Sequence, residues 1–332
     1  MSLSTSSNSP FYKGTPIRQR TSLAAALGST LHRIEYVAPR ANKLYRLAHA
    51  ELKSDGTIRQ TFDAKPLLKD LHRRIKTEIL DRVTFPDYLT GSLKGRDYKS
   101  NAELHEGAAI VIAEDIENFF PNTTSDKVFD IWRHFFRFSE PVAQLLTSLT
   151  TKDGALPQGA ITSPQLANLV FWRDEPLLQA KLAADDITYS RFVDDVTVSS
   201  VVPIPAENKT ELVGAIYGLL RRNGLQPKRV KHELKTRRER MAVTKLTVND
   251  KAGLSAKERS RIRAAVHRLE LKGAQQLLEA GELASVLGKV HHMARFHPGE
   301  ARPLKARLLK ISAHGCAATP SEQSPLPPCS EP

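Results

Sequence analysis

Three carboxylates stand where a single sheet could bring them together. Asp115 closes a short apolar run, residues 108–113, which favours a buried strand. Asp194 and Asp195 follow 79 residues later, between two short apolar runs within residues 189–199 that predict a hairpin with a tight turn. If strand and hairpin are neighbours, the three side chains meet at the sheet edge. Oxygen ligands of this kind suit Mg²⁺, and two such ions would activate a 3′-hydroxyl and stabilise a leaving pyrophosphate.

A second pair of adjacent aspartates provides an internal control. Asp185 and Asp186 precede the predicted hairpin in a polar connection. Aspartate is a common turn residue, so an Asp-Asp dipeptide alone is weak evidence for a metal site. We interpret Asp185 and Asp186 as turn residues only.

The surrounding pattern predicts helices packed behind a sheet. Residues 66–80 carry apolar side chains at every fourth position, which indicates an amphipathic helix. Residues 128–136 are also apolar at helical spacing. Ser163 and Pro164 resemble an N-cap and a proline at the first helical position, and predict a helix to about residue 182. The apolar face of the first helix would consist of Leu67, Leu71, Ile75 and Ile79. Together with the strand and hairpin, these helices indicate an α+β fold.

The charge of the chain is distributed unevenly. The 332 residues carry a net charge of +13. Residues 221–310 hold 23 Lys and Arg against 8 Asp and Glu, whereas residues 106–200 hold 7 against 14. A basic third suits a phosphate backbone, and an acidic middle is explained if some carboxylates hold divalent cations. Solvated helix faces that keep the protein soluble are the plainer alternative.

The remaining composition excludes several protein classes. Cys316 and Cys329, in a Pro/Ser-rich tail, are the two cysteines, which excludes a disulfide framework or a cysteine zinc site. No apolar run approaches the roughly 18 residues of a membrane span, and the N-terminus lacks the features of a secretory signal. We therefore expect a cytoplasmic protein without a membrane partner.

Three ordered motifs make the function more specific. DIENFF (115–120), LPQGAITSPQLANL (156–169) and FVDD (192–195) resemble motifs A, B and C of a reverse transcriptase. The resemblance implies a right-hand polymerase of fingers, palm and thumb, with a ferredoxin-like palm sheet and a helical thumb. It also implies that the catalytic residues and ligands of two Mg²⁺ ions are Asp115, Asp194 and Asp195, and that the backbone carbonyl of Ile116 faces a metal.

The same resemblance assigns residues to the incoming nucleotide. Phe120 falls where the family keeps an aromatic gate against a 2′-hydroxyl, although without the motif a core aromatic beside Phe119 would be preferred. Gln158 and Gly159 would border the nucleotide.

Two basic residues would contact its phosphates. Residues 53–60, KSDGTIRQ, resemble the fingers hairpin, whose arginine grips the triphosphate, and Arg59 is the candidate. Lys231 aligns with a motif D lysine that protonates the leaving pyrophosphate. A solvated side chain is the alternative for Arg59, and several other basic residues crowd the stretch around Lys231.

Two further elements resemble bacterial retron reverse transcriptases. NAELH at residues 101–105 matches their NAxxH element, with Asn101 and His105 as candidate RNA-binding residues. VTKLTVN at residues 243–249 resembles their VTG element, which grips structured RNA.

The candidates from the VTG-like element are Val243, Thr244 and Lys245. Two departures from the family pattern occur: Lys245 replaces the glycine of VTG, and FVDD replaces YADD. The first puts cognate-RNA recognition of the usual type in doubt, whereas the second keeps both aspartates.

A basic helix is predicted near the C-terminal end. In residues 257–272, basic side chains alternate with Ile262, Val266 and Leu269, which indicates an apolar face toward the core and a basic face outward. Such a face can follow a duplex by contacting phosphates and 2′-hydroxyls. Arg259 and Arg263 are therefore candidate RNA-binding residues, and an ordinary surface helix is the alternative.

These interpretations give a division of the chain along its length. We predict the following segments: a flexible N-terminal segment (1–20), fingers (21–105), palm (106–240), a basic helical thumb (241–312) and a disordered tail (313–332).

The leading hypothesis is an RNA-directed DNA polymerase that copies a structured non-coding RNA into cDNA from dNTPs. The retron resemblance further implies priming from a 2′-hydroxyl of that RNA, an effector protein as partner, and a role in antiphage defence. Three alternatives remain: a defence-associated reverse transcriptase of non-retron type, a non-catalytic RNA-binding scaffold whose polymerase fold is degenerate, and an intron-type maturase. The intact aspartates argue against the scaffold, and the lack of an appended domain argues against the maturase.

Overall fold

The computed structural model describes residues 8–52 and 56–316. The first part of the predicted flexible segment (1–7), the start of the predicted fingers motif (53–55) and most of the predicted tail (317–332) lie outside the described residues. The chain divides into two compact units, Met1–Thr244 with Val248–Lys251, and Lys245–Thr247 with Ala252–Pro332. The finer division into fingers, palm and thumb stays a prediction.

The first unit mixes helices and strands. Its helices are α1 (Arg20–Ala26), α2 (Leu31–Val37), α3 (Pro66–Glu78), α4 (Tyr98–Glu103), α5 (Phe119–Asn122), α6 (Ser125–Asp130), α7 (Glu140–Thr150), α8 (Ser163–Asn168), α9 (Glu175–Ala184) and α10 (Ala206–Arg222). Its strands are β1 (Phe11–Tyr12), β2 (Tyr45–Leu52), β3 (Ile58–Ala64), β4 (Val83–Thr84), β5 (Ile110–Asp115), β6 (Thr188–Phe192), β7 (Asp195–Ser200), β8 (Glu233–Thr236) and β9 (Ala242–Val243). Short turns of 3-10 helix are η1 (Ala38–Leu44), η2 (Leu80–Arg82) and η4 (Arg229–Lys231), and η3 (Ile131–Phe135) is a π-helical turn.

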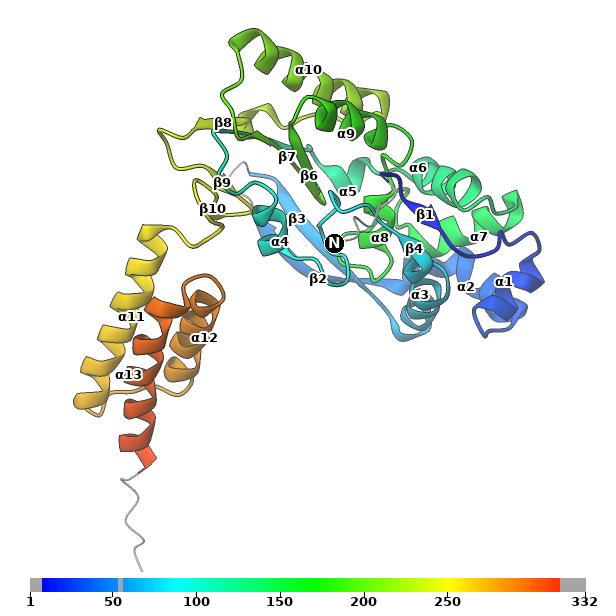
Figure 1. The fold of residues 1–332 in the computed structure, drawn as a ribbon. Coiled ribbons are helices and arrows are strands. Elements are labelled where there is room, and N and C mark those ends of the chain that lie inside the picture. The colour runs from blue at the N-terminus through cyan, green and yellow to red at the C-terminus, as the bar shows by residue number, and fades with distance from the viewer. Residues whose placement is uncertain (1–7, 53–55, 317–332) are drawn as a thin grey trace, which may run out of the picture. The chain divides into compact units, whose positions relative to one another are not determined.

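Four of these strands form the central sheet, in the order β6-β7-β5-β8 with antiparallel neighbours. Helices separate β5 from β6 and β7 from β8, while β6 and β7 form a hairpin. This succession and strand order are those of a ferredoxin-like βαββαβ sheet. In Figure 1, α9 and α10 lie side by side along this sheet.

The alternation of side chains along β5 separates two faces of the sheet. Glu114 accepts a hydrogen bond from the hydroxyl of Tyr217 on α10, at 3.3 Å. Successive side chains of a strand point to opposite faces. Asp115 is therefore directed to the face away from α10.

The predicted helix over residues 163–182 is two helices. Thr162, not Ser163, is the N-cap residue of α8, which ends at Asn168, and α9 begins at Glu175. The intervening turn buries the ring of Phe171. Periodicity could not reveal this break, because both helices bury apolar side chains at similar spacing.

Two smaller predictions also need correction. The apolar face of α3 uses Leu68, and Leu67 is exposed. The predicted flexible segment includes a strand, because Phe11 and Tyr12 pair with β4. The ring of Tyr12 packs edge-on against Phe136 at 4.8 Å, which explains its order.

The second unit contains β10 (Leu246–Thr247), α11 (Ala256–Ala274), α12 (Glu282–Ala294) and α13 (Pro298–Cys316). Ile262, Val266 and Leu269 of α11 are buried, as their spacing predicts. Its three helices pack against one another. No helix in the described part of either unit is long and apolar enough to cross a lipid bilayer.

Candidate active site

The end of β5 and the tip of the β6–β7 hairpin bring the three carboxylates together. Asp115, the last residue of β5, is the direct antiparallel partner of Asp195, the first residue of β7. The amide of Ile116 donates a hydrogen bond to the carbonyl of Asp194 at 2.9 Å. The sheet therefore produces the predicted convergence, whereas the roles of these residues as metal ligands stay predictions.

The turn that presents Asp194 has an unusual backbone. Phe192 pairs with Asp195, so the turn consists of Val193 and Asp194. Two-residue hairpin turns favour positive φ because it matches the twist of the strands. Val193 has φ 62°, a conformation that a β-branched residue rarely adopts. The turn is thus strained at the residue immediately before Asp194.

Burial and neighbouring negative charge raise the pKa of the two hairpin aspartates. Burial raises the pKa of Asp194 above its ordinary value, and the negative charge of Asp115 adds to the effect. Asp195 has an exposed surface, yet desolvation by the surrounding protein and the charges of Asp194 and Asp115 raise its pKa to about 7. Crowded carboxylates of this kind favour a bound cation, which relieves their repulsion.

Lys231 supplies a cationic group to the same cluster. The amide of Lys228 donates to the carbonyl of Asp115 at 2.7 Å, so the segment before η4 runs beside the end of β5. From η4 the ammonium of Lys231 contacts Oδ2 of Asp115. On the opposite face, His232 Nδ1 lies 2.6 Å from Oε1 of the buried Glu114. These contacts anchor the Lys231 segment on both faces of the sheet.

The β2–β3 hairpin joins the predicted nucleotide-binding residues of motif B. Arg59 on β3 donates from Nε to Oε1 of Gln158 at 3.3 Å. The amide of Phe62 donates to the carbonyl of Gln158 at 2.7 Å. Gly159 has φ 97°, and a Cβ there would lie 2.9 Å from the carbonyl oxygen of Phe62. The close approach of the hairpin therefore requires glycine at this position.

The two adjacent phenylalanines of α5 differ in burial. Phe119 is buried and stacks on Phe171, with ring centroids 6.2 Å apart. Phe120 is half-buried and meets Phe119 edge-on at 5.7 Å. Phe119 is thus the core aromatic, and Phe120 keeps a surface that a nucleotide could contact. Its role as a gate stays a prediction.

The NAxxH element lies inside the protein, which corrects the prediction that its side chains contact RNA. Asn101 and His105 are each 1% exposed. Asn101 accepts a hydrogen bond from the hydroxyl of Thr90 at 2.6 Å. The ring nitrogens of His105 each lie 2.7 Å from a serine hydroxyl, Ser199 on β7 and Ser190 on β6. This element therefore supports the hairpin on the face of the sheet to which Asp115 is directed.

The VTG-like element is partly buried as well. Val243 is 2% exposed, so its side chain does not reach RNA, contrary to the prediction. The hydroxyl of Thr244 donates to the carbonyl of Tyr98 at 2.7 Å. Lys245 is exposed and has φ 71°, which explains why glycine suits this position. Thr244 and Lys245 remain the candidates for RNA contact.

The predicted RNA-binding arginines of α11 converge on one glutamate. Arg259 Nη1 contacts Oε1 of Glu300 on α13, and Arg263 Nη1 lies 2.9 Å from its Oε2. Arg263 is the more exposed of the two, with 48% of its side chain accessible against 29% for Arg259. Their basic charge is therefore partly neutralised within the unit.

One arginine with a structural role near the site, Arg191, was not predicted from the sequence. Arg191 on β6 is fully buried and pairs with Glu175 at 2.6 Å. The signal was present, because a basic residue within a strand of buried side chains requires a partner.

In residues 8–52 and 56–316, no group of three or more His, Cys, Asp or Glu side chains is arranged so that it could hold a metal ion as it stands. The ammonium of Lys231 contacts Asp115 instead. The hard oxygen donors and raised pKa values nevertheless suit a divalent cation.

Comparison with known proteins decides the family. Residues 52–251 match the family model of reverse transcriptases (RNA-dependent DNA polymerases). The chain is also 33% identical over 311 residues to the Retron Se72 reverse transcriptase of Salmonella heidelberg (strain 579083-10), which covers 92% of this chain and 82% of that protein. The chain belongs to the retron-type reverse transcriptases. It is accordingly an RNA-directed DNA polymerase.

Further relatives of this retron-type reverse transcriptase align over most of its length. The Retron Ec48 reverse transcriptase of Escherichia coli is 28% identical over 322 residues, 91% of this chain and 78% of that protein. The Retron Mx65 reverse transcriptase of Myxococcus xanthus is 28% identical over 316 residues, 89% and 72%.

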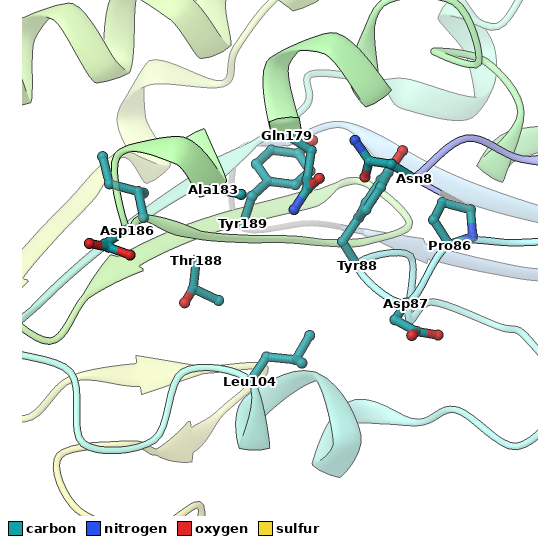
Figure 2. Close-up of a pocket in the computed structure, with 11 residues that line it drawn as sticks. Asn8, Pro86, Asp87, Tyr88, Leu104, Gln179, Ala183, Asp186, Thr188 and Tyr189 are labelled. Atoms are coloured by element: carbon teal, nitrogen blue, oxygen red, sulfur yellow. The ribbon is translucent and has the colours of Figure 1, made fainter. Parts of the chain in front are cut away.

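The reverse transcriptase also has a cavity of about 410 Å³ at the outer edge of β6. Figure 2 shows Tyr88, Tyr189, Asn8 and Gln179 on one side of the strand and Leu104 on the other. None of the three catalytic candidates lines it.

Proposed function

We propose that this retron-type reverse transcriptase copies a structured non-coding RNA into DNA by nucleotidyl transfer supported by two Mg²⁺ ions. The direct register of Asp115 with Asp195, with Asp194 in the adjoining turn, carries the proposal. When bound, the ions would supply Lewis-acid activation of a primer hydroxyl and neutralise charge at the departing pyrophosphate.

The carboxylates would divide the work by position. Asp115 and Asp194 would provide the main ligand oxygens and Asp195 would complete the set, with the backbone carbonyl of Ile116 as a further ligand. Lys231 contacts Asp115 directly. In the reacting complex its ammonium exchanges this carboxylate for the leaving pyrophosphate and donates a proton to it.

The nucleotide would lie against the β2–β3 hairpin. Arg59 and Gln158 contact each other, so the triphosphate can replace Gln158 as the hydrogen-bond partner of the Arg59 guanidinium. Gln158 and Gly159 would then border the sugar and base. Phe120 would exclude a 2′-hydroxyl by steric contact and so favour deoxynucleotides.

In this scheme the ferredoxin-like sheet is the palm, the elements before it belong to the fingers, and the helices of the second unit form the thumb. The backbone of the RNA would be contacted by Thr244, Lys245, Arg259 and Arg263. RNA phosphates would replace Glu300 as the partner of the two arginines. The names of the relatives support a retron RNA as template and primer. They also support cDNA as product. The sequence resemblance to retrons alone carries the further proposal of an effector protein as partner and a role in antiphage defence.

The test is DNA synthesis by the purified protein with its neighbouring transcript, Mg²⁺ and labelled dNTPs. Asp194→Ala should abolish synthesis while RNA binding persists. Asp185→Ala, in the other Asp-Asp pair, is the matched control and should synthesise DNA at the wild-type rate. Equal activity of wild type and Asp194→Ala would refute the proposed site.

A further inference from the structure

A buried ion pair lies next to the turn formed by Val193 and Asp194, which we call the catalytic turn. This ion pair has no role in the proposed chemistry. Arg191 on β6 donates from Nε to Oε1 of Glu175 at 2.6 Å and from Nη2 to Oε2 at 2.8 Å. The two residues are 0% and 1% exposed. Removing both charges of a bidentate pair from water costs free energy. The other hydrogen bonds of the pair therefore indicate its structural role.

The guanidinium of Arg191 also links the catalytic turn to α8, which belongs to motif B (residues 156–169). Its Nη1 donates to the carbonyl of Val193 at 3.0 Å, and its Nη2 donates to the carbonyl of Asn168 at 3.0 Å. The Val193 carbonyl belongs to the peptide that leads into Asp194. Asn168 is the last residue of α8, whose terminal carbonyls need donors from outside the helix. The break between α8 and α9 is thus the place where Arg191 inserts.

The turn is held in its strained conformation from a second side. The amide of Thr90 donates to the carbonyl of Arg191 at 3.0 Å. At Gly91 an added Cβ would lie only 2.4 Å from the amide nitrogen of Val193. Val193, with its positive φ, therefore lies between the Gly91 backbone and the Arg191 guanidinium.

We propose that Arg191 is the positioning residue of the catalytic turn: held by Glu175, it fixes the Val193 carbonyl and so directs Asp194 toward Asp115. This inference rests on the proposed role of Asp194. A strained β-branched residue relaxes unless its surroundings hold it, and a displacement of about 1 Å at a catalytic group costs roughly a hundredfold in rate.

The outer end of this network reaches the cavity in Figure 2. The hydroxyl of Tyr189 donates to Oε1 of Glu175 at 2.7 Å, and its ring meets that of Tyr88 edge-on at 5.6 Å. Tyr189 thus orients the carboxylate that holds Arg191. Tyr189→Phe keeps the ring and removes one hydrogen bond, so its effect should be smaller than that of losing Arg191.

The decisive variant is Arg191→Met with Glu175→Leu, which removes both buried charges together and avoids leaving one unpaired. The maximal rate of DNA synthesis should fall at least roughly a hundredfold, with the KM for dNTP and the affinity for RNA within about threefold of wild type. Binding of Mn²⁺ to the protein–RNA complex, measured by electron paramagnetic resonance, should weaken by about tenfold or more. A folded double variant with wild-type rate and Mn²⁺ affinity would overturn the proposal.

Arg173 and Asp130 provide the matched control. They form a bidentate pair with the same chemistry at the surface, with Nη2 to Oδ1 at 2.9 Å. Arg173→Met with Asp130→Leu should leave the synthesis rate and Mn²⁺ binding unchanged. An equal loss in both double variants would mean that the effect is general destabilisation and would refute a specific role for Arg191.

Gly91→Ala tests the same turn without removing a charge, and it decides the matter if the double variant does not fold. The added methyl group pushes on Val193, so the rate and Mn²⁺ affinity should fall while RNA affinity persists. Gly214→Ala, whose Cβ meets nothing within 4 Å, is its control. Normal synthesis by Gly91→Ala would overturn the proposal. Synthesis by Asp194→Ala would instead refute the proposed active site, so the two failures are distinguishable.

Discussion

The two Asp-Asp pairs lie at opposite ends of strand β6. They share a dipeptide sequence but differ in their structural surroundings. Asp185 and Asp186 precede β6, are exposed, and serve as the end of α9 and the turn after it. Asp194 and Asp195 follow β6 and meet the end of β5. Both turns use a positive φ, 54° at Asp186 and 62° at Val193. Each dipeptide lies at a turn, and we expect chemistry only where another strand brings a third carboxylate.

The largest expected effect concerns that third carboxylate. Asp115→Asn removes one charge from the cluster and should lower DNA synthesis about a thousandfold or more, because several kcal/mol of metal-derived stabilisation depend on it. Asp186→Asn makes the same chemical change at the other pair and should change the rate less than about twofold. Primer extension with each variant measures the difference. If the two substitutions had equal effects, the contrast between the pairs would be wrong.

A smaller effect is expected at Lys231. Lys231→Ala should reduce the maximal rate about a hundredfold, the range typical of a lost proton donor, with RNA affinity unchanged. Lys231→Arg keeps the positive charge beside Asp115 but holds its proton too tightly to donate it. The arginine variant should therefore remain slow. Single-turnover rates check this, and full activity of Lys231→Arg would reduce the role of the lysine to charge alone.

Phe120 tests whether nucleotide selection depends on the residues near Asp115. Phe120→Ala should raise ribonucleotide incorporation about tenfold relative to deoxynucleotides, because a steric block is removed while the carboxylates remain. Phe120→Tyr keeps the ring and should retain discrimination. Competition between rNTP and dNTP in a primer-extension assay gives the ratio, and unchanged selectivity of the alanine variant would contradict the gate.

The smallest effect concerns the stability of the fold rather than catalysis. It depends on His105, which is buried against the β6–β7 hairpin, whereas Asp185 and Asp186 are exposed. Burial lowers the pKa of His105 from its ordinary value to about 3. Below about pH 6.5 the unfolded chain gains a proton that the folded protein does not, so stability is lost as pH falls. The loss from this residue should be about 2 kcal/mol at pH 5.

His105→Gln cannot titrate and should therefore show a weaker decline between pH 7.5 and pH 5, although it is less stable at both. Urea unfolding at the two pH values gives the comparison. An identical decline in wild type and variant would show that His105 is not buried in its neutral form.

The sequence predicted what is local and repetitive, and missed what depends on distant partners. The strand ending at Asp115 and the hairpin bearing Asp194 were predictable because apolar runs and turn residues mark them directly. The break between α8 and α9 was not, since it is stabilised by Arg191 from another element. The burial of Asn101 and His105 was equally hidden, because polar side chains suggest a surface until their partners, Thr90 and two serines, are known.

The location of divalent ions tests the account most directly. Crystals of the protein with its RNA and a dNTP, grown in Mn²⁺, would reveal bound ions by anomalous scattering. We predict two peaks about 3.5–4 Å apart beside Asp115 and Asp194, with the ammonium of Lys231 no longer on Asp115. Absence of density at these carboxylates in a complex that holds both RNA and nucleotide would contradict the proposed active site.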